Sequence, residues 1–99
     1  MKLTVQPAAA EELREAAKFY AERAGQALGL ALIAEFERAL NFLALNPELG
    51  ATWRGTARRF LLRRFPYNIV YQIKPEELRV IALAHQRRRP SFWKSQNCP

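Results

Sequence analysis

The sequence predicts an α+β fold in the order β-α-α-β-β-β, in which a helical hairpin packs on a small, mostly antiparallel sheet. Two observations predict it. Apolar residues recur at helical spacing through the first half of the chain and alternate with period two in much of the second half. Ninety-nine residues suffice for one domain, so we expect residues 1–99 to form a single unit, with 91–99 as a flexible tail.

One strand and one helix are predicted before Gly25. Residues 3–5 are β-prone, and Pro7 stops that strand. Residues 8–24 then read as a helix, which Gly25 ends. The apolar residues of this helix share one face: Leu13, Ala16, Ala17 and Tyr20.

A second helix is predicted for residues 27–45, and it ends because Pro47 cannot donate to the helical ladder. Its apolar stripe is Leu28, Leu32, Phe36, Ala39, Leu40 and Leu43. The short connection at Gly25 predicts an antiparallel helix pair. Gly29 inside this helix predicts close packing of the two helices, since glycine there costs about 1 kcal/mol relative to alanine.

Three strands are predicted after a loop at residues 48–55. The first covers Arg58–Phe65, and Pro66 makes the next connection tight or bulged. Tyr67–Ile73 alternates as a half-buried strand does, and a hairpin turn follows at residues 74–77. The apolar run from Leu78 to His85 predicts a central strand.

Charge divides the chain into two unlike halves. Residues 1–50 carry five Lys or Arg and seven Glu, a net charge of −2, whereas residues 51–99 carry eleven Lys or Arg and two Glu, a net charge of +9. The basic residues are clustered: Arg54, Arg58, Arg59, Arg63 and Arg64, then Arg87, Arg88, Arg89 and Lys94. Such self-repulsion predicts an anionic partner, either nucleic acid or an acidic protein, although a solvated basic surface is the alternative for any single arginine.

Neighbouring residues of a strand point to opposite faces of the sheet. We therefore expect the two arginines of each adjacent pair, Arg58-Arg59 and Arg63-Arg64, to lie on different sides. One should lie on the sheet face opposite the helices, and the other at an edge or a bulge. Guanidinium groups bind phosphate and carboxylate in a bidentate manner. We therefore predict a partner- or nucleic-acid-binding set of Arg58, Arg59, Arg87, Arg88, Arg89 and Trp93.

Trp93 lies in a basic and polar segment, where its ring can stack on a base, anchor a partner segment or fold back over the sheet edge. His85 closes the last predicted strand, and counting by twos places it on one face with Leu83, Ile81 and Arg79. A neutral imidazole there can act as general base on a ribose 2′-hydroxyl, and a histidine hydrogen-bonded at a strand end is the structural alternative.

Several classes of function are excluded on composition. Cys98 is the single cysteine, one histidine is present and aspartate is absent, so we expect no disulfide, metal centre or cofactor. No apolar run is long enough for a membrane span and the N-terminus does not resemble a signal peptide, which predicts a cytoplasmic protein. Phosphate-binding loops, nucleophile elbows and paired carboxylates are also missing, which leaves metal-free catalysis or none.

Taken together, three segments resemble the RelE/ParE superfamily of type II toxin–antitoxin toxins. They are Arg63-Arg64-Phe65-Pro66-Tyr67-Asn68-Ile69-Val70-Tyr71, then Val80-Ile81-Ala82-Leu83-Ala84-His85, then Arg88-Arg89-Pro90 with Trp93. The resemblance covers residues 3 to 94 and includes the helix pair that ends in Asn46-Pro47. It implies a growth-inhibiting toxin, of the kind linked to plasmid stabilisation, that an acidic, partly disordered antitoxin segment holds inactive in a hetero-oligomer.

The resemblance implies two possible activities. RelE-like members cut messenger RNA in the ribosome without metal, and on that reading Arg63, Arg64 and His85 match the catalytic positions. ParE-like members inhibit DNA gyrase. This chain has no lysine in the basic strand and no tyrosine after Tyr71, so we predict a ParE-like gyrase inhibitor neutralised by a cognate antitoxin. A RelE-like endonuclease and a non-toxic module that binds an acidic partner are the alternatives.

Overall fold

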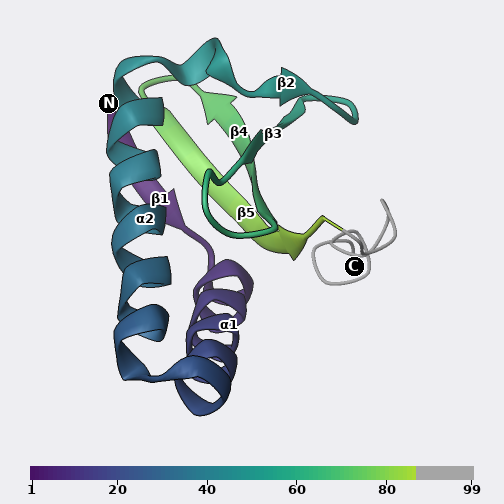
Figure 1. Ribbon diagram of the computed structural model, residues 1–99. Helices are drawn as coiled ribbons and strands as arrows, with labels where there is room; N and C mark the ends of the chain where they lie inside the picture. Colours follow the sequence, from purple (N-terminus) through teal and green to yellow (C-terminus); the bar gives the residue numbers. More distant parts are fainter. Residues whose placement is uncertain (87–99) are drawn as a thin grey trace.

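Two helices cover one face of a five-stranded mixed sheet (Figure 1). The structure is a computed structural model, and it describes residues 1–86. Its elements are β1 (Lys2–Val5), α1 (Pro7–Ala24), α2 (Gln26–Leu45), the 3₁₀ turn η1 (Pro47–Leu49), β2 (Ala51–Thr52), β3 (Ala57–Leu61), β4 (Tyr67–Lys74) and β5 (Glu77–His85). The predicted order is confirmed, while the tail expected at 91–99 lies outside the described residues.

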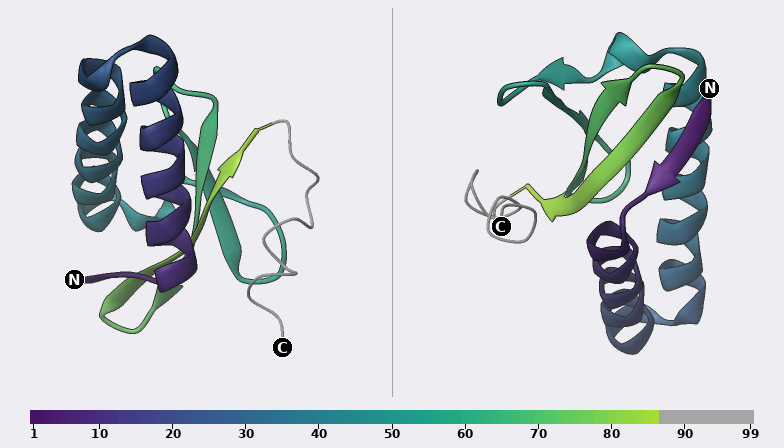
Figure 2. Two further views of the ribbon diagram at one scale, coloured as in Figure 1. Left: turned by 90° about the horizontal axis from the view of Figure 1, so that it is seen from below. Right: turned by 180° about the vertical axis from the view of Figure 1, so that it is seen from behind.

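The strands lie in the order β1-β5-β4-β3-β2. β1 runs parallel to β5, and the other three neighbouring pairs are antiparallel, so the sheet is mostly antiparallel as predicted. Parallel neighbours need a long crossover, and the chain between β1 and β5 contains both helices and the three other strands. Figure 2 shows both helices on the same side of the sheet. We call the face that neither helix covers the open face, and its apolar side chains form a second buried cluster, Ala57, Val70, Ile81, Ala82 and Ala84.

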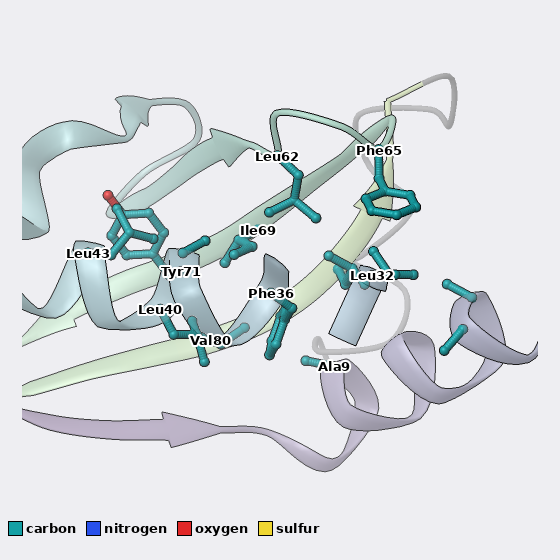
Figure 3. Close-up of a cluster of buried hydrophobic side chains, with 14 of the residues drawn as sticks. Ala9, Leu32, Phe36, Leu40, Leu43, Leu62, Phe65, Ile69, Tyr71 and Val80 are labelled. Carbon is teal, nitrogen blue, oxygen red and sulfur yellow. The ribbon is translucent and has the colours of Figure 1, made fainter. Parts of the chain in front are cut away.

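The core lies between α2 and the two longest strands (Figure 3). The α2 stripe predicted from the sequence packs there against β4 and β5, and Leu32 and Leu43 are fully buried. Their partners in the sheet include Ile69, Tyr71 and Val80, which are also fully buried. Burial of both surfaces against each other is the main favourable contribution to folding.

Gly29 confirms the close approach of the helices. A Cβ atom at this position would lie 2.6 Å from the carbonyl oxygen of Ala17 and 3.2 Å from the Cβ of Ala21. Gly25, between the helices, has a φ of 105°, a conformation that glycine adopts with little strain. The two glycines therefore place α1 directly on α2.

The region between α2 and β4 differs from the prediction in two ways. The expected loop at 48–55 contains η1 and the short strand β2, which pairs with β3 and gives the sheet its fifth strand. The strand predicted at Arg58–Phe65 ends at Leu61. Beyond it, Leu62 donates its N–H to the Tyr67 carbonyl at 2.9 Å, which closes a tight connection through residues 62–66.

The predicted face of His85 is wrong because β5 contains a β-bulge. Tyr71 is paired with Val80 and Val70 with Ala82, so Ile81 has no direct partner on β4. Side chains after Ile81 change face relative to a simple count by twos. His85 therefore lies with Leu83 on the helix-facing side, whereas the bulged Ile81 belongs to a separate apolar cluster on the open face.

A carboxylate from α1 reaches the strand just after this bulge. The N–H of Leu83 donates to Oε1 of Glu12 at 2.9 Å, a contact between residues far apart in the chain. This pairing is not predictable from the sequence, because an acidic residue early in a helix is readily explained by the helix dipole. Glu12 thus stabilises a position where the sheet is irregular.

The packing at Gly29 predicts that Gly29→Ala destabilises the fold although alanine is the better helix former. The steric conflict with Ala17 should cost about 1–3 kcal/mol in the free energy of unfolding, measured by urea denaturation. Ala34→Gly, at an exposed position of the same helix, is the control and should cost about 1 kcal/mol from helix propensity alone. A Gly29→Ala protein as stable as the original would contradict the close packing.

Candidate functional site

The arginines of β3 face opposite sides of the sheet. Arg59 is paired with Val70 and lies on the open face, away from the helices. Its guanidinium carbon is 5.7 Å from the centre of the Trp53 ring, and that of Arg54 is 5.8 Å from the same centre. Both distances suit a cation–π contact. The open face thus carries a tryptophan with two arginines beside it.

Arg58 instead points to the helix side and holds the segment that follows α2. Its Nη1 donates to the carbonyl oxygens of Glu48 at 3.1 Å and Gly50 at 2.8 Å. The Tyr71 hydroxyl donates to the carbonyl of Pro47 at 2.7 Å and accepts the N–H of Gly50 at 2.8 Å. These four hydrogen bonds fix η1 against the sheet, so the Arg58 side chain positions the loop.

Burial raises the pKa of the Tyr71 phenol above its ordinary value. The hydrogen bond from Gly50 and the charge of Arg58 act in the opposite direction and are smaller effects. On β5, hydrogen bonding to Arg79 lowers the pKa of the Glu77 carboxyl. Arg79 is therefore already paired with a carboxylate.

A hollow of about 570 Å³ lies between α2 and the connection from β3 to β4. We call it the α2 groove. Its lining residues are Glu35, Arg38, Ala39, Phe42, Phe60, Leu62, Arg63 and Arg64. Arg63 and Arg64 were predicted to separate across a strand, but they lie together here because the strand ends at Leu61.

Glu35 is buried at this groove and has a structural partner. Its Oε2 accepts the N–H of Arg64 at 2.9 Å, so the carboxylate holds the connection in place. The guanidinium carbon of Arg64 is 5.7 Å from the centre of the Phe65 ring. The main chain of Arg64 is thus fixed by the helix, and its charged end lies at the rim of the groove.

His85 lies apart from that groove. It is paired with Tyr67, and the two rings meet edge to face with their centres 5.1 Å apart. His85 does not line the groove that contains Arg63 and Arg64. Within residues 1–86, the α2 groove therefore contains Arg63 and Arg64 but not His85. Arg87, Arg88, Arg89 and Trp93 lie outside the described residues.

Three groove residues, Glu35, Arg38 and Phe42, were missed by the sequence reasoning. Arg38 belongs to the acidic half of the chain, and Phe42 falls outside the predicted core stripe. The sequence feature that could have indicated Phe42 is that the second predicted helix carries large apolar residues outside its core stripe. Phe42 is 50% exposed and Leu45 is 81% exposed, so this helix has apolar surface on a side that the sheet does not cover.

Within residues 1–86, no helix is both long and apolar enough to cross a membrane. Over the same residues, no group of three or more His, Cys, Asp or Glu side chains is placed to hold a metal ion.

Comparisons with known proteins identify relatives by family and by fold. Residues 3–90 match the family model described as "ParE toxin of type II toxin-antitoxin system, parDE". A solved structure described as "Chromosomal ParDE TA system from P. aeruginosa" superposes with a TM-score of 0.77. It is 19% identical and the match covers 86% of this chain and 95% of that one, which shows a shared fold. No curated protein was matched by sequence.

The Tyr71 contacts predict a specific response to alkaline pH. Below the ordinary tyrosine pKa of about 10, the Tyr71 phenol is protonated in both the folded and the unfolded protein. Its full contribution to the free energy of unfolding is then present. As pH rises further, the unfolded state loses the proton first, so stability falls until the folded-state pKa is passed. Tyr71→Phe should therefore lose less stability above that pH than the original protein.

The same variant should be less stable at neutral pH by about 1–3 kcal/mol, because Pro47 and Gly50 lose a buried hydrogen-bond partner. Urea denaturation across the pH range measures both effects. Tyr20→Phe, at a half-buried tyrosine on α1, serves as the control. Equal alkaline losses in the original protein and in Tyr71→Phe would contradict the assignment.

Proposed function

Because the chain belongs to the ParE toxin family of type II toxin–antitoxin systems, we propose that it arrests growth by inhibiting DNA gyrase and that a cognate antitoxin neutralises it. The family match over residues 3–90 is the observation that carries this proposal. The family description supports a toxin that works with an antitoxin. Gyrase as the target is supported by the resemblance of the sequence to ParE-like members of the superfamily.

The arrangement of the basic residues supports action by binding. A general base must lie within hydrogen-bond reach of the hydroxyl it deprotonates, while nearby cations hold the phosphate. Arg63 and Arg64 line the α2 groove, whereas His85 packs on Tyr67 outside it. The chain also has no tyrosine after Tyr71 to act as an acid near its C-terminus.

Neutralisation is proposed to depend on the basic half of the chain. Of the residues predicted to bind the partner, Arg59 offers its charge on the open face beside Trp53. The Arg58 side chain is engaged by the carbonyls of Glu48 and Gly50, so its contribution would be indirect, through the position of η1. Arg87, Arg88, Arg89 and Trp93 remain predicted contacts. An acidic antitoxin segment would be drawn to this surface by its charge.

The proposal predicts that the purified protein inhibits gyrase supercoiling of plasmid DNA and that adding the antitoxin encoded beside it restores supercoiling. Ribosome-bound messenger RNA should stay intact at the same protein excess. Cleaved message with unaffected gyrase would instead establish the endonuclease, for which His85→Ala should abolish cleavage while circular dichroism stays unchanged. Cells that keep growing after induction would reduce the protein to a binding module.

A second prediction concerns salt. If the basic surface binds the acidic antitoxin, affinity should fall steadily between about 0.1 and about 1 M salt, as the Debye length falls from about 10 to about 3 Å. Isothermal titration of the two purified proteins at several salt concentrations measures this. An affinity that does not change with salt would show that the arginines contribute little to the contact.

A further inference from the structure

A second hollow, of about 550 Å³, lies at the end of the sheet where β3 and β5 finish and β4 begins. We call it the sheet-end hollow. Of the described residues that line it, only Phe60 also lines the α2 groove. Its volume lies within the range of about 300–1,000 Å³ that is usual for ligand pockets. The lining residues are Leu49, Ala51, Arg59, Phe60, Leu61, Asn68 and Gln86.

Two side-chain amides meet at this hollow from neighbouring strands. Asn68 on β4 is paired with Ala84 on β5, whose side chain belongs to the cluster on the open face. Gln86 lies two residues beyond Ala84, and its N–H donates to the carbonyl of Pro66 at 2.8 Å, which continues the pairing of the two strands. Residues two apart in a strand share a face. Asn68 and Gln86 are therefore diagonal neighbours on the open face, at the spacing of about 7–8 Å usual for such pairs.

These two amides differ from another amide of the same face. Gln72 on β4 donates from Nε2 to Oγ1 of Thr56 at 3.0 Å. Within residues 1–86, no equivalent hydrogen bond engages the side chains of Asn68 and Gln86. A side-chain amide carries a donor and an acceptor next to each other, which is the pattern found along the edge of a nucleic-acid base. The sheet-end hollow therefore offers two such groups to a ligand.

Apolar side chains and a cation complete the hollow. Leu49 and Leu61 line it and are 49% and 51% exposed, so they present apolar surface to a ligand. Arg59 also lines it, with its guanidinium carbon 5.7 Å from the centre of the Trp53 ring. A base held outside a helix stacks between apolar or aromatic side chains, and guanidinium groups bind phosphate. The lining thus suits a base together with the phosphate next to it.

The charges and the amides together favour a nucleic acid over an acidic peptide. Glu77 lies on the same face of β5 and is already paired with Arg79, so its charge opposes an anion less than a free carboxylate would. The carboxylate of an acidic side chain only accepts hydrogen bonds. It would use the donors of the amides at the hollow and leave their acceptors unpaired, whereas a base edge with a donor beside an acceptor uses both.

We propose that the sheet-end hollow binds an unstacked base of single-stranded DNA. The base lies against Leu49 and Leu61. Its edge pairs with the amides of Asn68 and Gln86, and a neighbouring phosphate binds Arg59. The inference goes beyond inhibition of gyrase, because it gives the protein a DNA contact of its own. It rests on the proposed function in the choice of DNA over RNA, since gyrase acts on DNA.

The ligand side of the test uses the full-length protein and a short, fluorescein-labelled oligodeoxyadenylate. Fluorescence anisotropy should show saturable binding. The affinity should be at least about fivefold higher than for an abasic strand of the same length and charge, because only the first strand can pair with the amides. Equal binding of the two strands would show that the phosphates alone are attracted, and it would overturn the proposal.

The chain offers matched variants for the protein side. Asn68→Leu and Gln86→Leu remove the amides and should each weaken binding at least about fivefold. Gln72→Leu, at the amide outside the hollow, is their control and should leave the affinity unchanged. Arg59→Gln should weaken binding more than Lys74→Gln, which removes the same charge at the other end of β4. Equal losses in the hollow variants and the controls would overturn the proposal.

Circular dichroism establishes that each variant is folded. Gln86 is exposed and lies beyond the end of β5, so Gln86→Leu keeps the test decisive if Asn68→Leu fails to fold. An unchanged affinity in a folded Gln86→Leu protein would contradict the role of the paired amides.

Two other ligands supply the competing outcomes. An oligoadenylate RNA that binds more tightly than the DNA, with the same sensitivity to Asn68→Leu, would overturn the choice of DNA. A polyglutamate peptide that displaces the DNA at equal charge would reduce the site to a basic surface and overturn the proposal. The assay does not use gyrase. DNA binding without inhibition of gyrase would contradict only the proposed target, and inhibition without DNA binding would contradict only this inference.

Discussion

The packing of α2 on β4 and β5 is the contact on which the rest of the structure depends. Replacing a fully buried leucine such as Leu32 or Leu43 by alanine typically costs about 2–5 kcal/mol, a large share of the stability of a small domain. Once α2 is placed, α1 must lie where Gly29 admits it, and β1 enters the sheet beside β5. Glu12 and Glu35 then reach from the helices to backbone amides of the sheet layer.

Periodicity was sufficient to predict the two helices, the order of the elements and most of the core, because it reports which side chains share a face. It does not report which backbone groups are paired. For that reason it missed β2, which has only two residues, and it extended β3 past Leu61 into a connection rich in arginine and apolar residues. The bulge at Ile81 changed the face of His85 for the same reason. Each of these features depends on a hydrogen bond between distant segments.

Charge was also an incomplete guide to the site. Counting arginines by halves of the chain treated Arg58 as available for a ligand, but the structure engages its side chain with the carbonyl oxygens of Glu48 and Gly50. The same count placed Arg38 in the acidic half. Folding brings Arg38 to the same groove as Arg63 and Arg64, so the arginines of the α2 groove come from both the acidic and the basic half of the chain. A binding surface is set by tertiary contacts, which no division of the sequence can anticipate.

The contact between Glu35 and Arg64 has a consequence for binding. A connection held only by its ends would have to become ordered when a partner arrives, and that ordering would reduce affinity. Here the buried carboxylate already fixes the main chain of Arg64, and Leu62 is bonded to Tyr67 at the start of the same connection. The wall of the α2 groove is therefore formed before any partner binds. A flexible partner would lose conformational entropy when it binds, and a preformed groove adds no such loss on the side of this protein.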